Sequence, residues 1–258
     1  MRSCRRIPIT SMGKSTGAKP STARPLYTSR AYKGPFLPPS EKSGGLAPCE
    51  SSLESLLVAA ANLDTRVKHI RTQPFVMDVG TGLCAPTRVD LADKLKEHGF
   101  DPADAVLWFV DALIERFDRI EPTLIEAKPG HKARQAKTAE KLQDRSEACR
   151  RAGYGYATVT DEFFEAVFKR NVRILRRYQD HFVDDTTRAA LVQAARQAGE
   201  RRLTIGQLAT VVLGSVSDVY SVIADGTLRA FLRQEVLDSL ALVTTGEGPP
   251  LPFLPLDD

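Results

Sequence analysis

Two apolar, β-like runs at residues 106–117 and 123–127 are separated by only a short polar connection, which predicts two neighbouring strands. A Lys-, Ala-, Gln- and Glu-rich segment at 131–152 predicts a long helix that ends at Gly153. A strand candidate at 154–160 follows, and then a helix expected to begin at Asp161 and to carry Phe163 and Phe164. This order of strands and helices predicts an α/β domain.

The segment before these strands has a helical pattern at residues 50–62, with Ser51 or Ser52 as the expected N-cap and Glu54 in the first turn. Residues 67–79 are expected to be extended, and a charged helix is expected at 89–98. These elements precede the strand pair and extend the same α/β domain towards the N-terminus.

The character of the chain changes near residue 180, where short amphipathic segments at 186–198, 204–213 and 215–224 predict a second, helical domain. The last two segments, with residues 226–231, would suit a helix-turn-helix with a small wing. We therefore expect a basic arm at 1–45, an α/β domain at 46–180, a helical domain at 181–245 and a loose Pro- and Gly-rich tail at 246–258.

The composition is that of a folded, soluble protein, since 42% of the residues are hydrophobic and 26% are charged. No run approaches the roughly 20 apolar residues of a membrane-spanning helix, so we do not expect an integral membrane protein. The four cysteines form no Cys-x-x-Cys pair and no two histidines lie at i, i+4 spacing, which argues against a zinc site or a disulfide scaffold. A reducing, cytoplasmic location fits best, and carboxylates would have to bind any metal.

Charge is distributed unevenly, because residues 1–45 hold nine Lys/Arg and one acidic residue, Glu41, whereas the rest holds 27 basic and 31 acidic residues. Such an arm, rich also in Ser, Thr, Pro and Gly, would be attracted to phosphate, and DNA is one candidate partner. A solvated leader is the alternative, and the scarcity of acidic residues also fits an organelle transit peptide.

The segment Leu124-Ile125-Glu126-Ala127-Lys128 leads an apolar strand into a carboxylate and a lysine, and alternation places Glu126 and Lys128 on the same face. Asp111 lies inside the preceding run. If the two strands are neighbours, Asp111 and Glu126 would lie close together, and a cation such as Mg²⁺ would relieve their repulsion. Lys128 could then stabilise charge on a phosphate during hydrolysis. The alternative is that these are solvent-facing residues with an ordinary ion pair.

Basic residues on the long helix are the candidates for contact with a DNA backbone beside this site. They are Lys132, Arg134, Lys137 and Lys141. A solvated helix face explains these residues nearly as well.

Several segments resemble, in order, the PD-(D/E)xK restriction-like nuclease superfamily, and specifically the TnsA-type endonuclease subunit of heteromeric transposases. The segment from Cys49 to Glu54 looks like the family's Glu-Ser-x-x-Glu helix, and that from Arg71 to Phe75 resembles its Arg-Glu-Gln-Pro/Phe strand. Glu126-Ala127-Lys128 matches its Glu/Gln-x-Lys strand, and residues 158–162 resemble the strand and helix start that follow the long helix. The family usually has Pro-Asp-Phe or Thr-Asp-Phe where this chain has Val110-Asp111-Ala112, after a helical insertion.

The resemblance implies a restriction-endonuclease-like core, a central mixed sheet flanked by helices, and a smaller winged-helix-like domain. It implies that Glu54, Asp111 and Glu126, with the Ala127 carbonyl, bind Mg²⁺, as two ions for which Mn²⁺ can substitute, and that Lys128 is the catalytic lysine. The activity would be hydrolysis of the 5′ non-transferred strand at transposon ends in a bacterial cell, on the nucleoid. A DDE-type transposase and an AAA+ ATPase regulator would be the partners.

Two other functions remain open on the sequence. One is a stand-alone restriction or repair nuclease of the same superfamily, which would cut without a transposase. The other is a catalytically inactive DNA-binding scaffold subunit that recognises DNA through its C-terminal domain.

Overall fold

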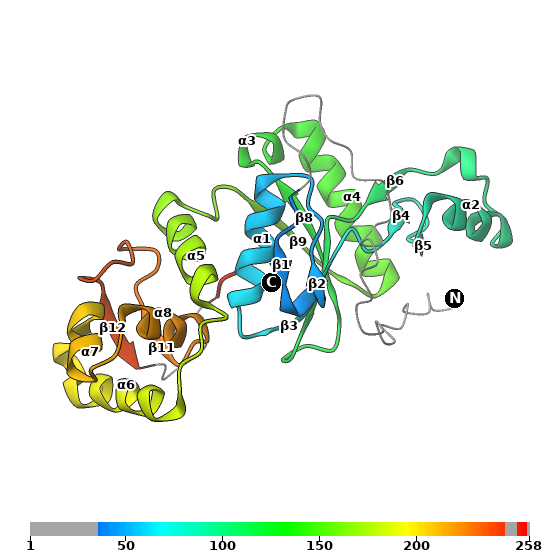
Figure 1. Ribbon diagram of the computed structural model, residues 1–258. Helices are drawn as coiled ribbons and strands as arrows, with labels where there is room; N and C mark the ends of the chain where they lie inside the picture. The colour runs from blue at the N-terminus through cyan, green and yellow to red at the C-terminus, as the bar shows by residue number, and fades with distance from the viewer. Residues whose placement is uncertain (1–35, 246–251, 257–258) are drawn as a thin grey trace. The chain divides into compact units, whose positions relative to one another are not determined.

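A computed structural model describes residues 36–245 and 252–256 of the chain. Expectations for the basic arm up to residue 35, and for tail residues 246–251 and 257–258, fall outside the described residues. The described chain combines helices with mixed sheets, which confirms the predicted α/β class (Figure 1). The described residues form two compact units: 36–58, 66–162 and 255–256 make the first, and 59–65, 163–245 and 252–254 the second.

The first unit contains a four-stranded sheet in the order β3-β7-β8-β9. Strands β3 and β7 are antiparallel to their next neighbours, whereas β8 and β9 are parallel. The parallel pair is joined through helices, as a parallel connection requires. The elements involved are β3 (Val67–Thr72), β7 (Ala112–Arg116), β8 (Thr123–Lys128), α3 (Gly130–Ala133), α4 (Ala136–Ala152) and β9 (Gly155–Thr160).

Around this sheet lie α1 and two smaller strand groups. Helix α1 (Ser52–Leu63) begins close to the predicted residue, and its apolar stripe is buried, as the pattern indicated. A three-stranded sheet, β5-β4-β6, packs with α2, and a short hairpin, β1-β2, encloses η1. The bounds are β1 (Pro39–Ser40), η1 (Glu41–Ser43), β2 (Gly45–Leu46), β4 (Val76–Asp78), β5 (Cys84–Ala85), α2 (Arg88–Glu97), η2 (Pro102–Asp104) and β6 (Leu107–Phe109).

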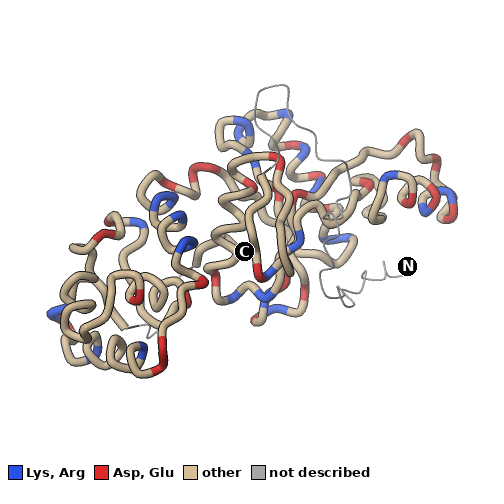
Figure 2. Tube along the Cα trace, viewed as in Figure 1, with Lys and Arg blue, Asp and Glu red and all other residues tan. Residues whose placement is uncertain are grey.

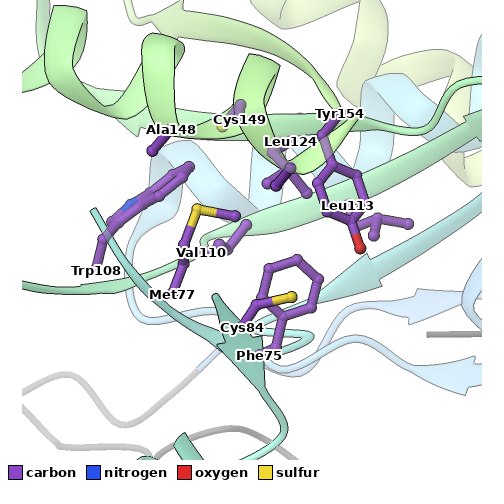
Figure 3. Close-up of a cluster of buried hydrophobic side chains, with 11 residues drawn as sticks. Phe75, Met77, Cys84, Trp108, Val110, Leu113, Leu124, Ala148, Cys149 and Tyr154 are labelled. Carbon is purple, nitrogen blue, oxygen red and sulfur yellow. The ribbon is translucent and has the colours of Figure 1, made fainter. Parts of the chain in front are cut away.

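A buried cluster joins α4 to one face of the sheets (Figure 3). Ala148 and Cys149 of α4 lie against Leu113 of β7 and Leu124 of β8, and Trp108 belongs to the same cluster. Burying apolar surface in this way is the main stabilising contribution to such a unit. Because Leu124 lies on this face, alternation places Glu126 and Lys128 on it as well.

Two expected elements are interrupted. The run at 106–117 forms two strands, β6 and β7, with Val110 and Asp111 in the break between them, because β6 pairs with β4 while β7 pairs with β3 and β8. The long helix expected at 131–152 is divided into α3 and α4, which are separated by Arg134 and Gln135. The strand interruption is set by tertiary pairing, which local pattern does not encode.

The second unit is mainly helical, with a three-stranded antiparallel sheet in the order β10-β12-β11. The turn between α7 and α8 bends the chain by 113°. Both helices begin with a capping box, formed at Thr204 and at Ser215. The elements are α5 (Ala166–Tyr178), α6 (Asp185–Ala198), η3 (Gly199–Arg201), β10 (Leu203–Thr204), α7 (Ile205–Val211), α8 (Val216–Ala224), β11 (Leu228–Ala230) and β12 (Leu242–Thr245).

Three features of this unit differ from expectation. The division falls between Glu162 and Phe163 instead of near residue 180, so α5 belongs to the second unit. Phe163 and Phe164 precede α5 instead of lying on it, because their rings pack with each other and against Phe168. The tail at 252–256 is packed against the fold, since Phe253, Leu254 and Leu256 are buried.

No single helix in the described ranges is both long and apolar enough to cross a membrane, and one bent pair, α7 with α8, reaches that threshold only jointly.

Candidate active site

Strand β8 lies between β7 and β9, so its side chains are buried until the strand ends at Lys128. Glu126 is 1% exposed, and its Oε1 lies 2.6 Å from Nζ of Lys128. The prediction that the two side chains share a face is therefore confirmed. About a third of the Lys128 side chain remains open to solvent, although its ammonium is paired with Glu126.

Glu126 accepts from two further groups that the sequence did not reveal as part of the site. Nη1 of Arg145, on α4, lies 2.7 Å from Oε1, and the indole Nε1 of Trp108 donates to Oε2 at 2.5 Å. The Arg145 guanidinium also lies over the Trp108 ring, 5.3 Å from its centroid. Trp108 is a core residue, as predicted, but its N–H has a second role. The only sequence signal for Arg145 was its i+4 spacing from Lys141.

Asp111 occupies the break between β6 and β7 and lies beside β8, where the backbone N–H of Ala127 donates to its Oδ2 at 2.8 Å. The Asp111 residue keeps part of its surface open to solvent. The pKa of Asp111 is raised to about 8, first by removal of the carboxyl from bulk water and then by repulsion from Glu126 and Glu54. The Ala127 N–H and Lys128 act in the opposite direction, but their effect is smaller. Three carboxylates therefore interact here through space.

Glu54 lies in the first turn of α1 and is 8% exposed. Its carboxylate is held by local sequence, because the Ser51 hydroxyl donates to Oε1 at 2.8 Å and the Glu50 N–H donates to Oε2 at 2.9 Å. The same carboxylate contributes to raising the pKa of Asp111. The residues predicted from the sequence, Glu54, Asp111, Glu126 and Lys128, are thus gathered in one place, and Ala127 borders them through its peptide.

Two buried thiols border the cluster. Burial first, and then Glu54 and Asp111, raise the pKa of the Cys49 thiol above its ordinary value. Burial also raises the pKa of Cys149 to about 12, with Glu126 contributing in the same direction. Both thiols are therefore protonated at neutral pH, which makes them unsuited to act as nucleophiles.

The carboxylate oxygens have the donor chemistry that Mg²⁺ prefers, and relief of their mutual repulsion would favour a cation. In the described part of the chain, however, no group of three or more His, Cys, Asp or Glu side chains is arranged to hold a metal ion. Both oxygens of Glu126 already accept from cationic or N–H donors. The donor set fits Mg²⁺ chemically, and Glu126 would have to release a partner in order to bind it.

The turn that follows Lys128 is held by residues after β9. The Gly130 N–H, at the start of α3, donates to Oδ1 of Asp161 at 2.7 Å. A side chain at Gly130 would meet the carboxylate of Glu162 at 2.3–2.7 Å, so glycine allows this close approach. Asp161 and Glu162 belong to a segment noticed in the sequence, but their contact with this turn was not foreseen.

The four basic residues proposed to contact DNA are exposed and lie on or beside α3 and α4: Lys132, Arg134, Lys137 and Lys141. Figure 2 shows both basic and acidic positions along these helices. Arg134 forms an ion pair with Glu162, and both side chains are more than half exposed. Acidic residues such as Glu140 and Asp144 are interspersed among them. This surface is thus of mixed charge, and DNA contact by these residues stays a prediction.

Neither a protein-family model nor a curated protein sequence matches the chain.

Proposed function

We propose that this protein is a metal-dependent DNA endonuclease and acts as the strand-cleaving subunit of a TnsA-type heteromeric transposase. The observation that carries the proposal is the convergence of Glu54, Asp111 and Glu126, distant in sequence, with the ammonium of Lys128 alongside. The strand order β3-β7-β8-β9, with α4 between β8 and β9, supports a restriction-endonuclease-like core.

The residues divide the chemistry of phosphodiester hydrolysis among them. Glu54, Asp111 and Glu126, with the Ala127 carbonyl, would hold Mg²⁺, as two ions, or Mn²⁺ in its place; such an ion polarises phosphate and makes a bound water more acidic. Lys128 stabilises the charge that develops on the phosphate and orients water, since about a third of its side chain is open to solvent. Glu126 fixes the position of that ammonium through their 2.6 Å contact.

The second unit is proposed to be a winged-helix-like module that binds a protein partner. Its order α6-β10-α7-α8-β11-β12 and its three-stranded sheet support that assignment. Helix α8, which would occupy a DNA groove in a helix-turn-helix protein, contains no Lys or Arg, and residues 219–224 are buried. This favours protein contact over DNA reading, and the resemblance suggests a DDE-type transposase and an AAA+ ATPase regulator as partners.

The test is nicking of supercoiled plasmid with Mg²⁺ or Mn²⁺. Asp111→Ala should abolish metal-dependent nicking and leave the circular dichroism spectrum unchanged. Asp93→Ala is the matched control, because Asp93 is an exposed carboxylate on α2 with a weak contact to Lys96 at 3.9 Å. Normal cutting by Asp111→Ala would remove the assignment. Cutting of any DNA by the chain alone, with no preference for transposon ends, would favour a stand-alone restriction or repair nuclease.

A catalytically inactive DNA-binding scaffold is the second candidate, and the bonding of Glu126 favours it. Both of its oxygens are occupied by Lys128, Arg145 and Trp108, as in a structural ion-pair network. Calorimetric titration with Mg²⁺ separates the two functions. The endonuclease predicts saturable binding that Asp111→Ala weakens, whereas the scaffold predicts no specific binding in either protein.

A further inference from the structure

Gln73 has a buried amide that the fold does not satisfy. The residue is 2% exposed, and neither its side-chain nitrogen nor its side-chain oxygen has a hydrogen-bond partner. An amide offers two N–H donors and a carbonyl acceptor, and burying them without partners costs free energy. A leucine of similar size would avoid that cost, so the amide needs an explanation outside packing.

The backbone brings Gln73 to the candidate active site. Thr72 pairs with Ala112, and Val76 pairs with Phe109, so three residues from Gln73 to Phe75 stand opposite two, Val110 and Asp111. This is a β-bulge, and the Gln73 N–H donates across it to the carbonyl of Asp111 at 2.9 Å. Bulges often re-aim a side chain beside an active site.

The bulge also holds Gln73 in an uncommon conformation. Its φ is 44°, in the left-handed region that non-glycine residues rarely occupy. Such strain persists where the surrounding structure imposes it, and it is frequent at ligand-binding positions. An unsatisfied buried amide and a strained backbone therefore coincide at the residue whose backbone N–H donates to the carbonyl of Asp111.

We infer that Gln73 is a substrate-binding residue of this site, whose amide N–H groups donate to a phosphate oxygen of DNA and whose carbonyl accepts from the attacking water. The inference rests on the proposed endonuclease function. Among the groups at the site, Glu54, Asp111 and Glu126 can only accept when ionised and Lys128 can only donate, so a neutral amide would supply both capacities to one ligand. A phosphodiester oxygen and a water together match that combination.

The test compares Gln73→Leu with Gln143→Leu, which removes an exposed amide from α4. Three quantities are measured: the urea midpoint, single-turnover nicking with Mg²⁺, and metal-free DNA affinity by fluorescence anisotropy. We expect Gln73→Leu to keep or raise the urea midpoint, to slow nicking at least tenfold and to weaken DNA binding severalfold. Gln143→Leu should leave all three quantities unchanged.

If Gln73→Leu nicks and binds DNA as well as the wild type does, the inference about Gln73 is wrong, whereas the endonuclease proposal is unaffected. A lowered urea midpoint would also overturn it, because the amide would then be satisfied within the fold, for example by a buried water. If the wild-type chain binds no Mg²⁺ and cuts no DNA in the presence of its partners, the endonuclease proposal fails first and the role of Gln73 fails with it.

Discussion

Two buried amides, one in each unit, differ in how far their hydrogen-bonding capacity is used. In the second unit, Asn171 is 0% exposed and fully engaged: its amide donates to the carbonyls of Leu232 and Glu235 and accepts from the Leu237 N–H, at 2.7–2.8 Å. In the first unit, Gln73 is 2% exposed, yet its side-chain amide has no hydrogen-bond partner, and the nearby Asp111 is a carboxylate repelled by two others. The Asn171 amide thus holds a loop in place, whereas the Gln73 amide is left unsatisfied by the fold.

The largest effect should come from Asn171→Leu, which removes the amide whose hydrogen bonds are all made within the fold. It leaves three buried backbone groups without partners, so we expect a loss on the order of 4 kcal/mol in the free energy of unfolding. Urea denaturation measures it, and Gln193→Leu, which alters an exposed amide on α6, is the control. A loss below about 1 kcal/mol would show that Asn171 is no more structural than Gln73.

Arg145→Ala tests the first unit, because it removes one of the cationic partners of the buried Glu126 carboxylate. Without metal, Glu126 keeps Lys128 and Trp108 but loses one cation, and we expect about 2 kcal/mol of destabilisation, since Arg145 is partly exposed. Adding Mg²⁺ should restore more stability to this variant than to the wild type, because a cation replaces the lost charge. Thermal melting with and without Mg²⁺ measures both effects. Equal metal responses in the two proteins would contradict the metal-binding role of Glu126.

The crowding of carboxylates around Asp111 in the first unit should make the stability of the protein depend on pH. The pKa of this group is raised from 3.8 to about 8, so the folded state holds the proton more tightly than the unfolded chain does. Its stabilising contribution is fully present below about pH 4 and is lost as the pH rises towards 8. In metal-free buffer, wild-type stability should fall between pH 5 and pH 8 by on the order of 1 kcal/mol more than that of Asp111→Asn. Parallel curves from urea melts would refute the crowding of the three carboxylates.

The smallest effect is expected from Gly130→Ala. The new methyl group would displace the Glu162 carboxylate, which is the exposed end of a flexible side chain, so the cost should be about 0.5 kcal/mol. Nicking should fall only severalfold, through a shift of the turn after Lys128. Denaturation and plasmid nicking measure the two changes. A loss of stability as large as that of Asn171→Leu would mean that this turn is part of the structural framework.

Local pattern predicted the elements whose sequence and packing agree. The apolar spacing at 50–62 predicted α1, and the apolar run at 123–127 predicted β8. Alternation along that strand predicted that Glu126 and Lys128 share a face. The order of the elements also predicted the α/β class. Asp111 lies beside β8 as expected, although it stands in the break before β7 and not on a strand.

What sequence reasoning missed depends on contacts between distant segments. The break at Asp111 and the bulge at Gln73 arise because neighbouring strands change partners there. Arg145 was not among the predicted site residues, because its position beside Glu126 is set by the packing of α4. Phe163 and Phe164 fit a helical pattern, but their ring contacts keep them outside α5.

Helix α1 has a consequence for any attempt to dissect this protein. The helix is continuous, yet its residues up to 58 pack with the first unit and those from 59 with the second. A fragment ending at residue 162 would lack the second unit, with which Ala60, Ala61 and Leu63 are grouped. The apolar side chains in the C-terminal half of α1 would then be exposed to water. Glu54 lies on the same helix, so a truncation would disturb its position. Its role is better tested by point substitutions in the intact chain.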